Sequence, residues 1–280
     1  DYAYQDWGGI RRNPDKNVVT REVLARVCEA HDFTRPYLPS SPYITEEAYV
    51  GGKPTSEEHL WGPRDYFKGP YYNTTVCHFA SEIGYHGCPA PASLRKFISK
   101  EELWPCFKEN GFPNDEWEAH STCMELLPDV AYSYRIRLME RQVKTLFGDD
   151  ESDQLFDFAK QSQISQAEAK KFFIERFRIS KWRRTGIIWW NLIDGWPQIS
   201  DAIVDYYYTK KLAYHYIKRS QNPVCLMFGE PVDNVISLYG VNDTIYDVDV
   251  SYKVTDVIAD GKVVLEGKSI LTGDTSLLIN

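Results

Sequence analysis

Three features are scarce in this 280-residue sequence, and each shortage excludes a class of protein. The sequence contains no apolar run long enough to cross a membrane. Its 32 basic residues are outnumbered by 40 acidic ones, and they form no basic stripe of the kind that binds a phosphate backbone. Its six cysteines form no CxxC pair. We therefore expect no membrane span and no nucleic-acid partner.

The cysteines leave several interpretations open. A chain of this size does not need disulfides, so reduced buried thiols are the simplest interpretation, although one bridge stays possible. A zinc site is conceivable from four residues, Cys77, His78, His86 and Cys88. However, the first two are adjacent and would point to opposite faces of a strand. We predict no metal and no cofactor. Reduced thiols favour the cytoplasm, while the periplasm and secretion stay open.

Aromatic residues are abundant, with 8 Trp, 19 Tyr and 13 Phe. Such side chains mostly pack cores, but their faces also stack on the apolar faces of sugar rings. Composition therefore keeps carbohydrate binding open beside the ordinary role in a core.

The first 222 residues alternate between strand and helix patterns. Strands are expected at 32–43 (broken by prolines), 59–62, 76–81 and 186–194, and helices at 18–31, 130–147, 153–178 and 210–220. About four strand-then-helix units make half of an eightfold (β/α) barrel. Half a barrel has exposed strand edges and an unfilled interior, so the pattern also indicates a truncated domain.

The sequence pattern changes from alternating strands and helices to strands alone after Asn222-Pro223. Strands are expected at 224–228, 235–239, 248–254 and 262–266, with a hairpin turn at Asp260-Gly261. These patterns predict an all-β module, a sandwich. Residues 223–280 are fewer than the roughly 100 that an immunoglobulin-like sandwich uses, so we expect it to be incomplete.

The segment from Cys77 to Cys88 is the most informative. A short apolar run ends in a single carboxylate, Glu82, and a glycine-containing turn follows. A buried strand delivers one acid to the mouth of a pocket in this way, which makes Glu82 a candidate nucleophile. The alternative is a structural acid that caps a following helix or pairs with a neighbouring arginine.

Four segments, taken in order, resemble the C-terminal half of the catalytic barrel of glycoside hydrolase family 2, closest to its β-mannosidase-like members. They are Arg35-Pro-Tyr-Leu-Pro-Ser-Ser-Pro42, His59-Leu-Trp-Gly62, Phe79-Ala-Ser-Glu-Ile-Gly84 and Trp190-Asn-Leu-Ile-Asp-Gly-Trp-Pro197. They are similar to the family's fifth to eighth strands. One such motif arises easily by chance, whereas four in order do not.

The resemblance implies a fold and an activity. The fold is the C-terminal half of a (β/α)8 TIM barrel, strands five to eight, over residues 1–222, followed by an incomplete immunoglobulin-like β-sandwich over 223–280. The activity is that of a retaining exo-β-glycosidase acting on β-mannosides, with β-galactoside, β-glucuronide and glucosaminide specificities open. Ile193, Asn191, Ile83 and His86 depart from the family's usual residues and put the sugar specificity in doubt.

The resemblance also implies roles for single residues. Glu82 would be the nucleophile, and Trp190 the apolar floor under the sugar. His59 and Trp61 would contact sugar hydroxyls or a ring face. The remaining candidates for substrate binding are Asn191 and Asp194, although Asp194 is equally well interpreted as a structural acid that fixes the strand-to-loop turn. Without the resemblance, each tryptophan would be interpreted as a core aromatic.

The second carboxyl group of a retaining site is absent from the sequence. In the family the acid/base stands in an Asn-Glu pair, and this sequence has no such dipeptide. We expect the acid/base just upstream of Asp1, on an N-terminal part of the same polypeptide that completes the barrel. The isolated chain is then expected to be inactive, because general acid assistance is worth about 10²–10⁴-fold. The alternative is a non-catalytic carbohydrate-binding or assembly module on a glycosidase scaffold.

Overall fold

The computed structural model describes residues 6–7, 10–11, 16–51, 56–121, 135–148 and 154–280. Its central feature is a parallel sheet in the order β3-β4-β5. These strands span Glu57–Leu60, Phe79–Gly84 and Gly186–Trp190. They confirm three of the predicted strands. The middle strand begins three residues later than expected, so Glu82 lies within β4 and pairs in register with His59 of β3.

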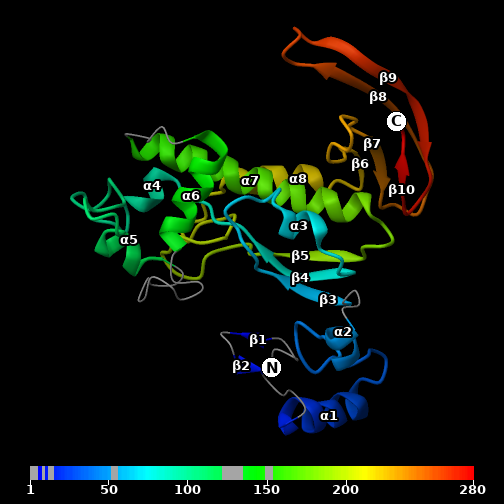
Figure 1. The fold of residues 1–280 in the computed structure, drawn as a ribbon, viewed down its shortest axis with the longest axis horizontal. Helices are drawn as coiled ribbons and strands as arrows, with labels where there is room; N and C mark the ends of the chain where they lie inside the picture. The colour runs from blue at the N-terminus through cyan, green and yellow to red at the C-terminus, as the bar shows by residue number, and fades with distance from the viewer. Residues whose placement is uncertain (1–5, 8–9, 12–15, 52–55, 122–134, 149–153) are drawn as a thin grey trace.

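Helices cover one face of this sheet (Figure 1). The longest is α7 (Leu155–Ile179), which packs against α8 (Leu212–Ser220) and β5. The aromatic residues Phe172, Phe173 and Phe177 of α7 meet Ala80 and Ile83 of β4 in one apolar cluster. The apolar side of this helix therefore packs on the sheet.

Shorter helices complete this part of the molecule. They are α3 (Pro70–Thr74), α4 (Pro91–Leu94), α5 (Asp115–Ala119) and α6 (Arg135–Phe147). A second apolar cluster, which includes Trp117 and Phe158, joins α4, α5 and α6 to the N-terminal half of α7. Helices predicted at 130–147 and 153–178 are confirmed over the residues that the structure describes.

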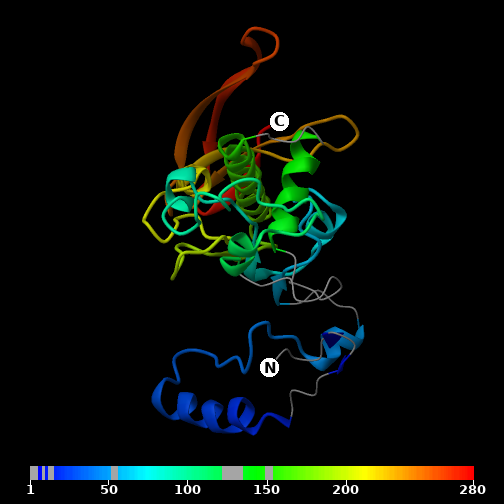
Figure 2. The ribbon, with the colours of Figure 1, turned by 90° about the vertical axis from the view of Figure 1, so that its left-hand side faces the viewer.

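The N-terminal residues lie at the end of the molecule opposite to the C-terminal hairpin (Figures 1 and 2). A two-stranded ribbon, β1 (Asp6–Trp7) and β2 (Ile10–Arg11), precedes a π-helical turn at Val19–Val23. The turn runs into α1 (Leu24–His31), so the helix predicted at 18–31 is confirmed. A short helix, α2 (Glu46–Gly51), follows.

The strand predicted within 32–43 is wrong. All of these residues are described, and none of them is in a strand. Pro36, Pro39 and Pro42 have no backbone N–H to donate, and a sheet tolerates proline only at an edge or a bulge. Within the described residues the parallel sheet therefore has three strands and not four.

The C-terminal part is built from antiparallel strands. A sheet in the order β10-β7-β6 contains Thr275–Leu278, Leu238–Asn242 and Val224–Phe228. A separate hairpin pairs β8 (Val248–Asp256) with β9 (Lys262–Leu271). Asp260 and Gly261 have φ values of 52° and 75°, as the predicted hairpin turn requires. The strand expected at 235–239 lies three residues later, at β7.

Ion pairs join the end of α7 to this all-β part. Asp243 accepts from Arg178 at 2.7 Å and from Lys181 at 2.6 Å, and Lys181 also reaches Asp274 at 3.0 Å. The indole of Trp182 donates to the Asp274 carbonyl at 3.0 Å. No helix in the described part of the chain is long and apolar enough to cross a membrane.

Candidate active site

The carboxylate of Glu82 lies against two side chains of the neighbouring strand β3 and its exit. Trp61 Nε1 donates to Glu82 Oε2 at 2.7 Å, and His59 Nδ1 lies 3.3 Å from the same oxygen. The Glu82 side chain remains 31% exposed, whereas its strand neighbours Ser81 and Ile83 are buried. The sheet therefore presents one acid to solvent with its orientation fixed.

The hydrogen bonds of His59 define how its proton must be placed. Ser41 Oγ donates to Glu57 Oε1 at 2.7 Å and lies 3.0 Å from His59 Nε2. Because the hydroxyl proton is used on Glu57, Nε2 must donate to Ser41. Nδ1 then faces Glu82 with a proton only when the imidazole is charged. Burial lowers the pKa of His59, and the charges of Glu82 and Glu57 oppose that shift.

Gly84 allows Trp61 to reach the carboxylate. A Cβ atom at this glycine would lie 2.5 Å from Trp61 Cη2 and 3.0 Å from Asp201 Oδ1. The Arg64 guanidinium lies over the same indole, 5.0 Å from the ring centroid. A side chain at position 84 would displace the indole of Trp61. Close packing therefore explains why a glycine stands at this position.

Trp190 ends β5 opposite Gly84 of β4, which places it at the same edge of the sheet as Glu82. Its side chain is 47% exposed, so an indole face is available to a ligand. The peptide bond between Trp190 and Asn191 is cis. Asn191 Nδ2 donates to the Ile193 carbonyl at 3.3 Å, which places this amide in the loop that follows the strand.

The surroundings of Asp194 are those expected of a structural acid that fixes the strand-to-loop turn. It is buried, and its Oδ1 accepts from Gln198 Nε2 at 2.8 Å and from Ser200 Oγ at 2.5 Å. Burial raises the pKa of its carboxyl group. These contacts fix the loop after β5.

Of the six predicted site residues, the structure brings three into direct contact, Glu82, His59 and Trp61. The roles of all six stay predictions.

A layer of buried charged residues lies behind this edge of the sheet, and the sequence did not reveal it. His86 Nδ1 lies 3.2 Å from Asp201 Oδ1, with both side chains buried. Burial lowers the pKa of His86 to about 4, so its imidazole is neutral at pH 7. Burial by itself would raise the pKa of Asp201, but the neighbouring groups His86, Arg64 and Lys170 hold it below its usual value.

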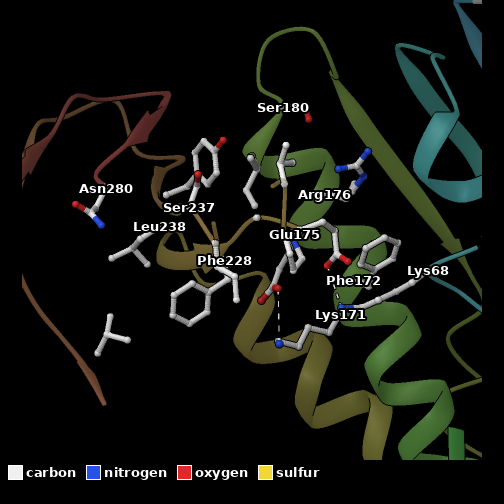
Figure 3. Close-up of a pocket in the computed structure, with 18 of the residues that line it drawn as sticks. Lys68, Lys171, Phe172, Glu175, Arg176, Ser180, Phe228, Ser237, Leu238 and Asn280 are labelled. Carbon is white, nitrogen blue, oxygen red and sulfur yellow. Dashed lines mark hydrogen bonds and ion pairs between the residues drawn. The ribbon is translucent and has the colours of Figure 1, made fainter. Parts of the chain in front are cut away.

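A wide groove lies elsewhere, between α7 and the all-β part (Figure 3). Its volume is about 770 Å³, and its lining includes Phe172, Phe228 and Leu238 with the ion pairs Lys68–Glu230 and Lys171–Glu175. None of the six predicted site residues lines it.

Among the described residues, no three His, Cys, Asp or Glu side chains are grouped to hold a metal, so the four candidates for a zinc site do not assemble.

The known proteins that this chain resembles are glycoside hydrolases. The chain is 26% identical over 250 residues to "Beta-mannosidase B" of Thermothelomyces thermophilus, a match that covers 81% of this chain and 26% of that protein. It is 26% identical over 160 residues to "Exo-beta-D-glucosaminidase" of Arthroderma benhamiae, which covers 55% of this chain and 17% of that one. The solved β-D-mannosidase of Dictyoglomus thermophilum matches 99% of this chain with a TM-score of 0.77 and 25% identity.

These matches confirm the resemblance to the β-mannosidases of glycoside hydrolase family 2. The fold is accordingly that of the corresponding part of these enzymes, a mixed α/β region followed by β-sheets. The chain spans about a quarter of the length of the curated β-mannosidases that it matches, and 32% of the solved one. A comparison with protein-family profiles finds no match.

Proposed function

We propose that this chain carries the nucleophile of a retaining exo-β-glycosidase, and that β-mannosides are its substrates. The observation that carries the proposal is the partly exposed Glu82 carboxylate, held by Trp61 and faced by His59 at the sheet edge that Trp190 also occupies. The names of the related β-mannosidases support the choice of substrate. β-Galactoside, β-glucuronide and glucosaminide specificities are the alternatives.

In this proposal Glu82 attacks the anomeric carbon and forms a covalent glycosyl-enzyme. The attacking group must be ionised, and the hydrogen bond from Trp61 fixes the orientation of the Glu82 side chain. Because the contacts of Trp61 and His59 both go to Oε2, Oε1 is the oxygen that attacks. The exposed indole of Trp190 forms the floor under the sugar, through contact with the apolar face of the ring.

Retention requires a second carboxyl group about 5–5.5 Å from the first, to protonate the leaving oxygen and then activate water. Within the part of the chain that the structure describes, the side chains in contact with the Glu82 carboxylate are the indole of Trp61 and the imidazole of His59. We place the acid/base outside these 280 residues, on another part of the same polypeptide. That part also supplies the remaining strands of a (β/α)8 barrel, in which β3, β4 and β5 are strands six, seven and eight. The β-sheets of residues 223–280 belong to an immunoglobulin-like sandwich.

The test compares this chain with the whole polypeptide in which its residues occur. Both are incubated with an aryl β-mannoside, and the sugar released is followed by proton NMR before its anomers equilibrate. We expect the whole polypeptide to release the β-anomer first and the chain alone to release none. First release of the α-anomer would contradict a retaining mechanism. Turnover by the chain alone would contradict the placement of the acid/base.

A non-catalytic carbohydrate-binding module is the second candidate, and the exposed aromatic rings favour it. Trp190 is 47% and Trp196 is 42% exposed, and Trp196 is stacked on His120 at 5.8 Å between ring centroids. Rings fixed in this way can bind sugars without cleaving them. Binding of mannosides by the whole polypeptide without any hydrolysis would support this candidate over the enzyme.

A further inference from the structure

Helix α7 presents two polar side chains to the C-terminal ends of the parallel strands. Gln166 Nε2 donates to the carbonyls of Tyr85 and Asp201, each at 3.0 Å, and to that of Ala202 at 3.2 Å. Lys170 follows one helical turn later, on the same side of the helix. The helix therefore contacts, through its side chains, the segments that leave β4 and the loop that follows β5.

Lys170 is buried and donates to the backbone carbonyl of Trp190. Its ammonium group also lies 5.7 Å from the centroid of the Trp189 ring. Both contacts are with the last two residues of β5, immediately before the loop of Asn191. The position of the Trp190 peptide group, and with it the direction of the indole, is thus tied to a charged group that comes from a different element.

Burying an ammonium group is energetically unfavourable. Removing its charge from water costs several kcal/mol unless an opposite charge and hydrogen bonds replace the lost hydration. Asp201 supplies the opposite charge and the Trp190 carbonyl supplies a hydrogen bond. A methionine would fill the same volume without that cost, but it would leave the carbonyl unpaired. The lysine is therefore matched to that carbonyl.

We propose that Lys170 is a positioning residue of this site, whose buried ammonium holds the Trp190 carbonyl and thereby fixes the indole on which the sugar stacks. The inference rests on the proposed glycosidase function, because only that function gives the Trp190 indole a sugar to bind. The contact between Lys170 and the Trp190 carbonyl can be tested without turnover. A distant helix residue would thus determine how the floor of the sugar site is placed relative to Glu82.

The charged groups that face Lys170 determine how its proton responds to pH. Asp201 lies in the loop after β5, where His86 and Arg64 also act on its charge, and Lys211 immediately precedes α8. Burial lowers the pKa of Lys170 to about 7, with Asp201 opposing the shift and Lys211 adding to it. The ammonium therefore loses its proton within a range of pH in which the protein can be studied.

The experiment uses 5-fluorotryptophan incorporated into the whole polypeptide, with the Trp190 resonance assigned through Trp190→Phe. In the unmodified chain we expect the ¹⁹F shift of Trp190 to titrate with a midpoint near pH 7. Lys170→Arg, whose guanidinium does not lose its proton in this range, should abolish that titration. Lys211→Met is the matched control, since Lys211 is also buried but bonds to the carbonyls of Gly87 and Ser200. It should move the midpoint to higher pH without removing it.

A second readout uses the rate at which the whole polypeptide is labelled by a 2-deoxy-2-fluoro-β-mannosyl fluoride. Lys170→Met should lower this rate about 10- to 100-fold, and Lys170→Arg should restore part of it. A Trp190 resonance that does not titrate, or that titrates unchanged in Lys170→Arg, would overturn the proposal. If no variant and no unmodified protein is labelled while the resonance behaves as expected, the glycosidase function fails and the positioning role stands.

Discussion

Glu82 and Asp201 are both carboxylates at the C-terminal edge of the sheet, but their surroundings are opposite. Glu82 is 31% exposed, accepts a hydrogen bond from the neutral indole of Trp61 and is faced by His59. Asp201 is buried behind Gly84, beside His86 and close to Lys170. The first is open to solvent, and the second is enclosed by charged groups that come from several elements.

This difference separates two tasks within one edge of the sheet. The exposed layer consists of Glu82 and Trp190, with the half-buried His59 beside Glu82. These are the groups that we propose contact the sugar, so changes there should affect chemistry more than folding. The buried layer of His86, Asp201 and Lys170 lies where water cannot replace a lost partner. Changes in the buried layer should therefore affect stability, and should reach chemistry only through position.

The largest expected effect comes from removing the buried carboxylate. Asp201→Asn removes the opposite charge that faces buried Lys170, so the free energy of unfolding should fall by about 3–5 kcal/mol. Urea titration at pH 7 measures this. The control is Asp243→Asn, which removes a carboxylate that is 38% exposed and paired with Arg178 and Lys181. Its cost should be about 0–1 kcal/mol. Equal losses in the two variants would remove the distinction between the layers.

Acid should destabilise the protein through His86. Burial places its pKa near 4 in the folded chain, below the value of 6.5 expected when unfolded. The unfolded state therefore binds the proton first, and the stabilisation present above pH 6.5 is lost as pH falls through 4. A shift of this size corresponds to about 3 kcal/mol. Urea titrations between pH 7 and pH 4 measure it. A His86→Gln variant with the same pH dependence would show that another group is responsible.

In the exposed layer, Trp61→Phe should slow chemistry and leave folding nearly intact. The ring remains, but the donor to Glu82 Oε2 is lost, and a hydrogen bond to a charged group is worth about 1.5–3 kcal/mol. The labelling rate of the whole polypeptide should therefore fall about 10- to 100-fold. Trp182→Phe is the control, because it also loses an indole hydrogen bond, but one to the Asp274 carbonyl. If both variants are labelled at the same rate, the Trp61 contact has no role in the site.

The smallest effect is expected in the groove of Figure 3. Lys68 is 37% exposed, pairs with Glu230 at 3.0 Å and lies over the Phe172 ring. Lys68→Met should change the free energy of unfolding by about 0–1 kcal/mol and leave labelling unchanged. Thermal unfolding and the labelling rate together check this. A marked loss of labelling would show that the groove contributes to the site after all.

The exposed layer was open to prediction because its signals are local in the sequence. His59 and Trp61 stand two residues apart beside a short strand, and Glu82 ends an apolar run before a glycine. Parallel pairing of adjacent strands then brings them together at one edge. The segment at 32–43 failed as a strand for an equally local reason, since its prolines remove the donors that a sheet needs.

The buried layer was missed because its residues are far apart in the sequence and because each of them fits a more ordinary interpretation. Lys170 and Gln166 lie within a helix whose phenylalanines dominate the pattern, and a polar residue there is usually interpreted as solvated. Gln163, Gln166 and Lys170 are spaced by three and four residues, so they share one side of the helix. That spacing is the signal that was available. Asp201 gave no signal, because only the folded loop after β5 places it beside His86.

The most direct test of the account is covalent labelling of the whole polypeptide with a 2-deoxy-2-fluoro-β-mannosyl fluoride, followed by peptide mapping. Fluoride leaves without protonation, so the result reports the nucleophile and does not depend on the acid/base. We predict an adduct on Glu82, lost in Glu82→Gln and kept in Glu58→Gln, a change to a neighbouring strand carboxylate that accepts from Thr75. An adduct on another residue, or no adduct at all, would contradict the assignment of Glu82 as the nucleophile.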